Sequence, residues 1–326
     1  MKVLNFGSLN LDYVYQVNSI LIPGETQAST DRKIFCGGKG LNQSIALAKA
    51  GVPVYHAGMI GDGGEILLET CRENNVNIKF IRQISGPSGH TVIQVDKNGQ
   101  NCILLYGGAN RSITRAFANE VLEHFEKGDI LLLQNEINEL DYIIERASQK
   151  EMKIFLNPSP YNDNLKKCDL NKVGMFLVNE IEGGQITGEK ELDKILEKFK
   201  EMYPKASVVL TLGGDGSMYQ DETGICRQNI FKVKAVDTTA AGDTFTGYFI
   251  ASILDGMKQA EGLRMAAKAS SIAVSRPGAA ASIPAFLPAS IHFRSHAILF
   301  PSVRMICRPS SSLRTSSGVL PCTMVQ

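Results

Sequence analysis

The stretch from Asp237 to Phe245 reads DTTAAGDTF and sets a carboxylate beside three small residues. An apolar helical pattern follows it, so Ala241, Gly242 and Asp243 are predicted to begin a helix. The free N–H groups and positive dipole end of such a turn favour a bound anion. A carboxylate in the same turn could take the proton of an attacking hydroxyl. The segment therefore predicts a site for phosphoryl transfer, which requires a cradle for charge, a metal and a base.

An ordinary helix cap is the alternative for this segment, because Asp and Thr are common at helix starts. The run of small residues ending in Gly242 is more than a cap requires, which favours the chemical interpretation.

A second glycine-rich motif, GGKGLNQ, runs from Gly37 to Gln43 and opens a predicted helix. Its glycines allow close backbone approach to a ligand. Lys39, Asn42 and Gln43 add polar groups that suit a polyhydroxylated ligand. The motif is not a Walker A loop, and no GxGxxG follows the first predicted strand, which argues against a dinucleotide site.

Polar side chains also follow predicted strands, at the edge where open α/β sheets bind ligands. Asn10 and Asp12 come just after the first strand, and Glu136 follows the run LLLQ. Asn10 and Asp12 alternate onto one face, so both could bond sugar hydroxyls. A simple Asx turn is the alternative for this pair.

Two further motifs fit the phosphate side of such a site. Asn179 and Glu182 lie three apart after a buried strand and could orient phosphate and water-bound Mg²⁺. An acidic residue that complements the helix dipole is the alternative. The turn TLGGDG, from Thr211 to Gly216, could lie along the phosphates of a nucleotide or simply form a hairpin turn.

Composition narrows the class of protein. The 326 residues carry a net charge of +1, with 44% apolar and 21% charged residues, as in soluble globular proteins. This charge gives no reason to expect nucleic acid or an anionic membrane as a partner. No apolar run is long enough for a transmembrane helix, and the first residues resemble a strand, not a signal peptide. Seven single cysteines without a CxxC pair, and five histidines without metal spacing, favour a cytoplasmic enzyme with reduced thiols.

The hydrophobic pattern predicts a doubly wound, mainly parallel α/β sheet with helices on both faces. Expected strands are 3–8, 54–60, 130–134, 153–156, 175–179 and 208–212, and expected helices are 40–50, 65–74, 114–126, 139–150 and 191–202. Short strands near 13–36 and 90–106, the latter around a KNG turn, predict a small β-sheet lid over the ligand. A mere extension of the sheet edge is the alternative.

The segment 286–326 differs from the rest of the chain. It contains no Asp, Glu or Lys but four Arg and eight Ser. We therefore expect this C-terminal tail not to belong to the evolved fold, which would then comprise residues 1–285.

Taken together, the motifs resemble those of the ribokinase-like (PfkB) carbohydrate kinases. The resemblance covers residues 1–285, and its strongest marks are the segments from Gly37 to Gln43 and from Asp237 to Phe245. Lys39, Gln43 and the segments NPSP (157–160) and GGAN (107–110) are similar to the ribokinase branch of this family.

The resemblance implies a role for each motif. Asp243 would be the base that deprotonates a primary sugar hydroxyl, and the amides of Ala241 and Gly242 would form an anion hole for the γ-phosphate of ATP. Implied sugar-binding residues are Asn10, Asp12, Gly38, Lys39, Asn42, Glu136 and Asp243. Implied nucleotide-binding residues are Asn179, Thr211, Gly213, Asp215, Gly216 and Gly242. Glu182 would act on Mg²⁺ indirectly, and implied K⁺-binding residues are Asp237, Thr239, Ala273, Arg276, Gly278 and Ser282.

The resemblance thus implies an ATP-dependent, Mg²⁺-requiring and K⁺-stimulated kinase, acting on O5 of D-ribose. A kinase for deoxyribose, fructose or a nucleoside, and a non-catalytic sugar-binding regulator, are the alternatives. The lid strands would pair across a homodimer. Two departures concern specificity: Ala267 replaces an Asn that is frequent near the adenine, and Asn135 replaces a frequent Leu, which would alter the sugar pocket.

Overall fold

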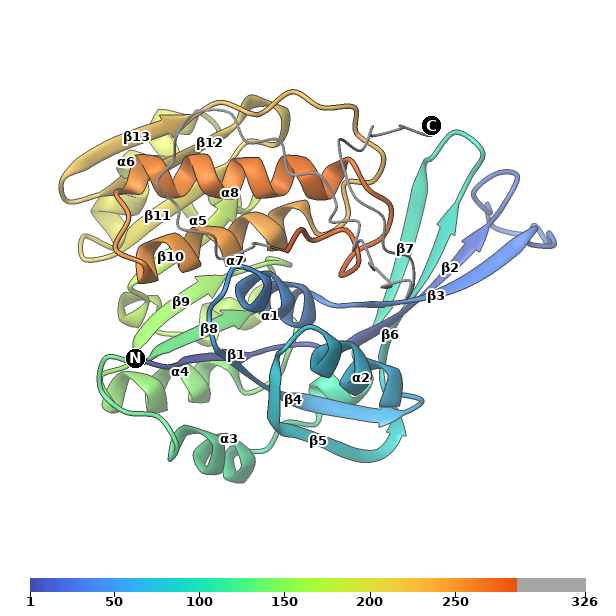
Figure 1. Ribbon diagram of the computed structural model, residues 1–326, viewed down its shortest axis with the longest axis horizontal. Helices are drawn as coiled ribbons and strands as arrows, with labels where there is room; N and C mark the ends of the chain where they lie inside the picture. The colour runs from blue at the N-terminus through green and yellow to red at the C-terminus, as the bar shows by residue number, and fades with distance from the viewer. Residues whose placement is uncertain (286–326) are drawn as a thin grey trace, which may run out of the picture. The chain divides into compact units, whose positions relative to one another are not determined.

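A nine-stranded sheet forms the centre of the fold in a computed structural model, which describes residues 1–285 (Figure 1). Its strand order is β13-β12-β11-β10-β9-β8-β1-β4-β5. β12 and β13 join the sheet antiparallel to their neighbours, and the other pairs are parallel. The strands are β1 (Val3–Phe6), β4 (Val54–Asp62), β5 (Asn77–Pro87), β8 (Ile130–Gln134), β9 (Lys153–Asn157), β10 (Met175–Asn179), β11 (Ser207–Thr211), β12 (Ser217–Asp221) and β13 (Gly224–Gln228).

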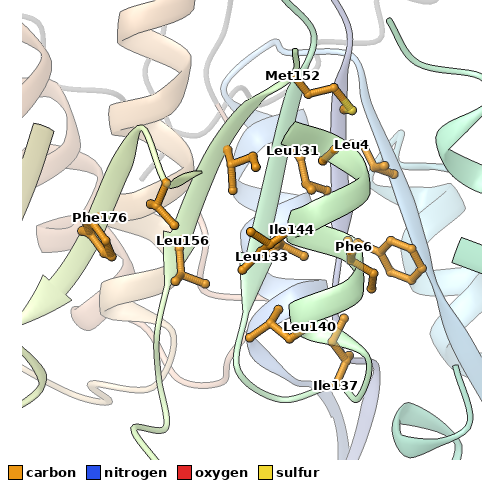
Figure 2. Packing of buried hydrophobic residues seen from close by; sticks show 14 of the residues in the cluster. Leu4, Phe6, Leu131, Leu133, Ile137, Leu140, Ile144, Met152, Leu156 and Phe176 are labelled. Atoms are coloured by element: carbon orange, nitrogen blue, oxygen red, sulfur yellow. The ribbon is translucent and has the colours of Figure 1, made fainter. Parts of the chain in front are cut away.

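Helices cover both faces of this sheet, because its central strands are apolar on both sides. Along β8, Leu131 and Leu133 pack with α3, α4 and α6, whereas Ile130 and Leu132 pack with α1, α2, α7 and α8. Figure 2 shows Leu131 and Leu133 packed with residues of β1 and α4. The helices are α1 (Lys39–Lys49), α2 (Glu65–Glu73), α3 (Arg115–Leu122), α4 (Leu140–Gln149), α5 (Glu180–Thr187), α6 (Leu192–Met202), α7 (Ala241–Leu254) and α8 (Gln259–Val274). The predicted doubly wound architecture is confirmed.

A separate four-stranded sheet has the order β3-β2-β6-β7 (Figure 1). It contains β2 (Asn10–Gln16), β3 (Asp31–Gly37), β6 (Gly89–Val95) and β7 (Asn101–Tyr106). Asn10, the first residue of β2, pairs with both Gly37 and Gly89. The end of the small sheet therefore lies at Asn10 and at Gly37, the first residue of the GGKGLNQ motif. The four short strands were predicted, and their assembly into a second sheet is confirmed.

Several elements differ from the prediction. The edge strands β5 and β13 were not predicted, because they carry mixed polar sequence with few buried residues. The largely buried strand β12 was expected only under the hairpin alternative for the TLGGDG segment. The predicted helix 114–126 ends as α3 at Leu122. The prediction for the C-terminal tail falls on 286–326, outside the described residues. Within residues 1–285, no helix has the length and apolar character needed to cross a bilayer.

Candidate active site

A cavity of about 260 Å³ lies where the central strands end. It is lined by residues from both glycine-containing motifs and from the ends of β9, β10 and β11. Its polar lining residues include Lys39, Asn157, Ser159, Asn179, Glu182, Thr211 and Asp243. The fold therefore brings together motifs that are spread over 200 residues of sequence.

The first turn of α7 forms one wall of this cavity through Ala240, Ala241, Gly242 and Asp243. Ala240 has a left-handed backbone, with φ of 59°, and begins the sharp turn into the helix. A Cβ added to Gly242 would meet no atom within 4 Å, so the space in front of this residue is open. The Ala241 amide donates to Thr238 O over 3.2 Å, whereas the next amides of the first turn, those of Gly242 and Asp243, border a space that an anion can enter.

The Asp243 carboxylate is 7% exposed and is held by two side chains of α1. Asn42 Nδ2 donates to Oδ2 over 3.0 Å, and Gln43 Nε2 donates to Oδ1 over 2.9 Å. Each oxygen of the carboxylate thus accepts one hydrogen bond. Such a carboxylate is fixed in orientation and keeps lone pairs with which to accept a proton.

Gln43 corrects an expectation from the sequence. The sequence predicts that its amide reaches toward a polyhydroxylated ligand, along with the Lys39 ammonium and the Asn42 amide. Its side chain is instead fully buried, because it lies between Asp243 and Gln134.

Lys39 lies among carboxylates at the start of α1. Burial alone would lower the pKa of Lys39, but the carboxylates of Asp243, Glu136 and Glu182 raise it above its usual value. Burial also raises the pKa of Glu136, although its Oε2 accepts hydrogen bonds from Ser8 Oγ and, over 3.0 Å, from the Lys39 amide. The pocket thus keeps one cation between several acids, which suits a ligand with hydroxyl and phosphate groups.

Close backbone contact requires the glycines of this motif. Gly38 has φ of 93°, a left-handed value that favours glycine. A Cβ on Gly40 would lie 2.4 Å from the Ser8 amide nitrogen, so α1 can begin directly against the end of β1 because Gly40 has no side chain.

Asp12 and Asn10 project from β2 of the small sheet. Burial raises the pKa of Asp12 to about 6, against the effect of a 2.6 Å hydrogen bond from Thr91 Oγ1. Asn10 is 2% exposed, and its Oδ1 accepts from Asn110 Nδ2 over 2.7 Å. Asn110 Oδ1 in turn accepts from the Leu9 amide over 3.0 Å, which fixes the chain where it passes from β1 into the small sheet.

Asn179 and Glu182 form a capping box at the start of α5. Asn179 Oδ1 accepts from the Glu182 amide over 2.8 Å, and Glu182 Oε2 accepts from the Asn179 amide over 3.2 Å. Both side chains also line the cavity. Helix capping and contact with a ligand, which the sequence presents as alternatives, are therefore compatible here.

The TLGGDG segment divides between two locations. Thr211 lines the cavity, whereas Gly213, Asp215 and Gly216 form the turn from β11 into β12 and do not line it. Gly213 and Gly216 have φ of 51° and 100°. The Leu212 amide donates to Gly216 O over 2.9 Å, which closes the turn.

Residues from the loops before α7 and after α8 meet at Asp237. Asp237 Oδ1 accepts from the Thr239 amide over 2.9 Å, and Oδ2 accepts from the Gly278 amide over 3.0 Å. The Asp237 amide donates to Val274 O, next to Ala273. The Arg276 amide donates to Ala273 O, and Ser282 Oγ donates to Ala279 O, so both residues close turns in their own loop. In residues 1–285 no three His, Cys, Asp or Glu side chains cluster as metal ligands.

Sequence reasoning missed several residues of the site. Glu136 accepts a hydrogen bond from Ser8, and Asp12 accepts one from Thr91. Asn110 holds Asn10 at the start of the small sheet, and the cavity is also lined by Asn157 and Ser159. Asn110, Asn157 and Ser159 lie in the GGAN and NPSP segments, which marked the family resemblance but were given no role in the site. Asn135 Nδ2 donates to Pro160 O over 2.6 Å. This amide therefore contacts the 157–160 loop, which contributes to the cavity wall.

Comparison with known proteins decides the family. The model of the pfkB family carbohydrate kinases matches residues 1–285. The chain belongs to this family. It is therefore a sugar kinase, and the resemblance seen in its motifs is confirmed.

Relatives in the pfkB family include the ribokinase of Schizosaccharomyces pombe, 31% identical over 310 residues, which cover 88% of this chain and 96% of the relative. A ribokinase from Cryptococcus neoformans, solved in complex with ADP, has a TM-score of 0.76 at 28% identity. This match covers 87% of this chain and 96% of that one. A ribokinase from Arabidopsis thaliana, complexed with ribose and ATP, has a TM-score of 0.75 at 27% identity, covering 87% and 95%.

Proposed function

We propose that this sugar kinase is a ribokinase, which transfers the γ-phosphoryl group of ATP to O5 of D-ribose. One observation carries the proposal: Asp243, in the first turn of α7, lines the same open cavity as Lys39, Glu182 and Thr211. A base thus stands beside an anion-binding helix start and beside a cation. Several relatives at about 30% identity are ribokinases, which supports ribose as the sugar that this chain phosphorylates.

In the proposed reaction the ribose O5 hydroxyl lies between Asp243 and the γ-phosphate. Asp243 accepts the hydroxyl proton while the oxygen bonds to phosphorus and the bond from phosphorus to the departing ADP oxygen breaks. The Gly242 amide and the Lys39 ammonium stabilise charge on the transferred group. Asn10, Asp12, Asn42 and Glu136 hold the other sugar hydroxyls.

The residues on the nucleotide side fit Mg²⁺. Glu182 is a largely buried carboxylate that lines the cavity, and Mg²⁺ needs few protein ligands because it keeps several waters. When bound with ATP, the ion neutralises phosphate charge. Asn179 and Thr211 line the same wall of the cavity.

We also propose that K⁺ stimulates the enzyme through the paired loops at Asp237 and Gly278. Both oxygens of Asp237 accept hydrogen bonds from backbone amides, so the carboxylate aligns the loops. The carbonyl oxygens of these loops would then hold the ion, with Ala273, Arg276 and Ser282 contributing. This suits K⁺, whose weak field favours neutral oxygens.

A homodimer through the small sheet, acting as a lid, completes the proposal. Asp12 lies in one cross-strand row with Phe35, Thr91 and Leu105, so the face that carries a sugar ligand also carries apolar side chains. Leu105 is 43% exposed and Ile103, on the same face, is 57% exposed. Apolar surface of this kind favours burial by a second chain.

A coupled assay of ADP release tests the proposal, with ATP and Mg²⁺ and with ribose, deoxyribose, fructose or a nucleoside as acceptor, each with and without K⁺. We expect the highest kcat/KM for ribose, with ribose 5-phosphate as the product identified by NMR. A higher kcat/KM for another acceptor would mean that this acceptor, and not ribose, is the substrate. Ribose binding without ADP release would indicate a regulator.

A further inference from the structure

A chain of buried polar side chains begins at Asp243 and leads away from the cavity. Gln43 Nε2 donates to Asp243 Oδ1 over 2.9 Å, and Gln43 Oε1 accepts from Gln134 Nε2 over 2.7 Å. Gln43 comes from α1 and Gln134 from the end of β8, and both are fully buried. Gln43 thus contacts the carboxylate without reaching the open cavity.

The chain continues through the main sheet. Gln134 Nε2 also donates to Asn5 Oδ1 over 2.9 Å, and Asn5 Nδ2 donates to Ser44 Oγ over 2.8 Å. Ser44 Oγ lies 2.8 Å from His56 Nδ1. These three residues are also fully buried, and they come from β1, α1 and β4. One connected network therefore links the carboxylate to the centre of the fold.

The direction of every hydrogen bond in this network is determined from its far end. His56 Nε2 lies 3.2 Å from Gly7 O, which can only accept, so Nε2 carries the proton. Burial lowers the pKa of His56 to about 4, so the ring is neutral and its Nδ1 accepts from the Ser44 hydroxyl. Ser44 Oγ must then accept from Asn5 Nδ2, which also donates to Gly40 O over 2.7 Å, so Asn5 Oδ1 is left facing Gln134.

The amide orientations follow from this direction. Gln134 must present its NH₂ group, because it faces two acceptor oxygens, Asn5 Oδ1 and Gln43 Oε1. A rotated Gln134 amide would place oxygen against both. Gln43, which accepts from Gln134, must in turn point its own NH₂ group at Asp243. The network thus guarantees a donor, never an acceptor, beside Oδ1 of the carboxylate.

Packing alone does not account for these residues. Asn5 lies between Leu4 and Phe6 on β1, and Gln134 follows the apolar run of β8. A core needs no amides here, and buried polar groups cost free energy unless all are paired. What the amides supply is a fixed donor to the one carboxylate in the network. Catalysis is sensitive to such orientation at distances well below 1 Å.

We propose that Gln43 and Gln134 are positioning residues for Asp243, with their amide orientation set by Asn5, which Ser44, His56 and the Gly40 carbonyl hold in turn. This inference rests on the proposed function, in which Asp243 is the base. Neither glutamine is required to contact sugar or nucleotide. Loss of the network should therefore lower kcat and leave the KM values for ribose and ATP nearly unchanged.

The test compares two leucine variants of buried glutamines. Gln134→Leu should lower kcat about 10-fold or more, since it removes the group that orients a hydrogen bond to a charged acceptor, while the KM for ribose changes less than about 3-fold. Gln220→Leu is the matched control. Gln220 is also buried on a strand of the main sheet, but it donates to Leu196 O, outside the network. A Gln134→Leu enzyme with the kcat of the control would overturn the inference.

A smaller change keeps the test available if Gln134→Leu does not fold. Ser44→Ala removes one oxygen and breaks the link between Asn5 and His56, and it should lower kcat about 3-fold or more at constant KM. Ser252→Ala is its control, because Ser252 is equally buried and donates only locally, to Phe249 O. If Ser44→Ala retains the kcat of Ser252→Ala, the far end of the network has no positioning role.

The outcome also separates this inference from the proposed function. If Asp243→Asn retains normal turnover, the function itself is wrong. If Asp243→Asn abolishes turnover while Gln134→Leu and Ser44→Ala behave like their controls, the base is correct and the positioning network is not.

Discussion

Asn42 Nδ2 lies 3.0 Å from Asp243 Oδ2, so the first helix of the chain holds a carboxylate that follows it by 201 residues. Neither motif alone contains this contact. It forms because α1 and α7 pack side by side on one face of the main sheet. The two helices are so close that a Cβ added to Gly247 would lie only 2.4 Å from Ala46 Cβ. The close packing of these helices fixes the distance from the carboxylate to the glycine-rich loop.

Replacement of this carboxylate is the most direct test of its role. Asp243→Asn keeps the shape and removes the base, and general-base catalysis contributes about 10²–10⁴-fold. We expect kcat to fall by that factor, with a small change in ribose affinity measured by calorimetry. Asp255→Asn, at the exposed end of the same helix, is the control. A normal kcat for Asp243→Asn would contradict the assignment.

Asp12 predicts opposite effects on stability and sugar binding. Its folded-state pKa of about 6 exceeds the usual 3.8, so the folded chain binds the proton more tightly than the unfolded chain. This contribution to stability is complete below pH 4 and is lost as the pH rises through about 6. Asp12→Asn avoids the loss, so above pH 6 it should raise the free energy of unfolding by about 1–2 kcal/mol, since a full two-unit shift corresponds to about 3 kcal/mol and the side chain is partly exposed.

Urea unfolding at pH 4 and pH 8 measures this effect. The stabilisation by Asp12→Asn should appear at pH 8 and vanish at pH 4, while the KM for ribose rises because a carboxylate acceptor is lost. Asp31→Asn, on the neighbouring strand β3 and exposed, provides the control. Equal stabilisation at both pH values would show that the charge of Asp12 is not responsible.

The sequence indicated the charged residues of the site, but it did not indicate the buried side chains that hold them in place. Asp243 and Lys39 lie in short motifs, in which a charged residue next to glycine and alanine indicates a ligand site from local sequence alone. Gln43 belongs to the same motif but points the other way, because its helical position faces β8 and not the cavity. Gln134, Asn5 and His56 are single polar residues in apolar strands, and no local pattern indicates their partners. The strand β13 was missed for a related reason: pairing with β12 stabilises it, not its own hydrophobic pattern.

The apolar lid face predicts a dimer that depends on Leu105. This side chain is 43% exposed on the face that carries Asp12, and burial of such a residue stabilises an interface by about 1.5–3 kcal/mol. Leu105→Lys should therefore reduce the molar mass measured by light scattering from that of a dimer to that of a monomer. Ile225→Lys is the control, because Ile225 is 51% exposed but lies on β13 of the main sheet. A monomeric wild-type chain would contradict the prediction at once.

Asp237 predicts a dependence on monovalent cations. Asp237→Ala removes the acceptor for the Thr239 and Gly278 amides, so the two loops lose their common anchor. We expect the K⁺ concentration for half-maximal activity to rise at least about 10-fold, because the carbonyls are no longer aligned. The measurement is a titration of kcat with KCl at constant ionic strength. Asp221→Ala, which removes a carboxylate that caps a turn on β12, should leave the K⁺ response unchanged. An unaltered response in Asp237→Ala would exclude these loops as the K⁺ site.

The left-handed residue before the anion-binding turn predicts an unusual response to glycine. Ala240 has φ of 59°, a conformation that costs a residue with a Cβ about 1–2 kcal/mol. Glycine adopts it freely but adds about 0.4–1 kcal/mol of entropy to the unfolded chain. Ala240→Gly should therefore keep the free energy of unfolding or raise it by up to about 1 kcal/mol. Ala251→Gly, in the interior of α7 at 5% exposure, should instead lose about 1 kcal/mol or more. Thermal unfolding of both variants decides the matter: an equal loss of stability would mean that the turn is not strained at Ala240.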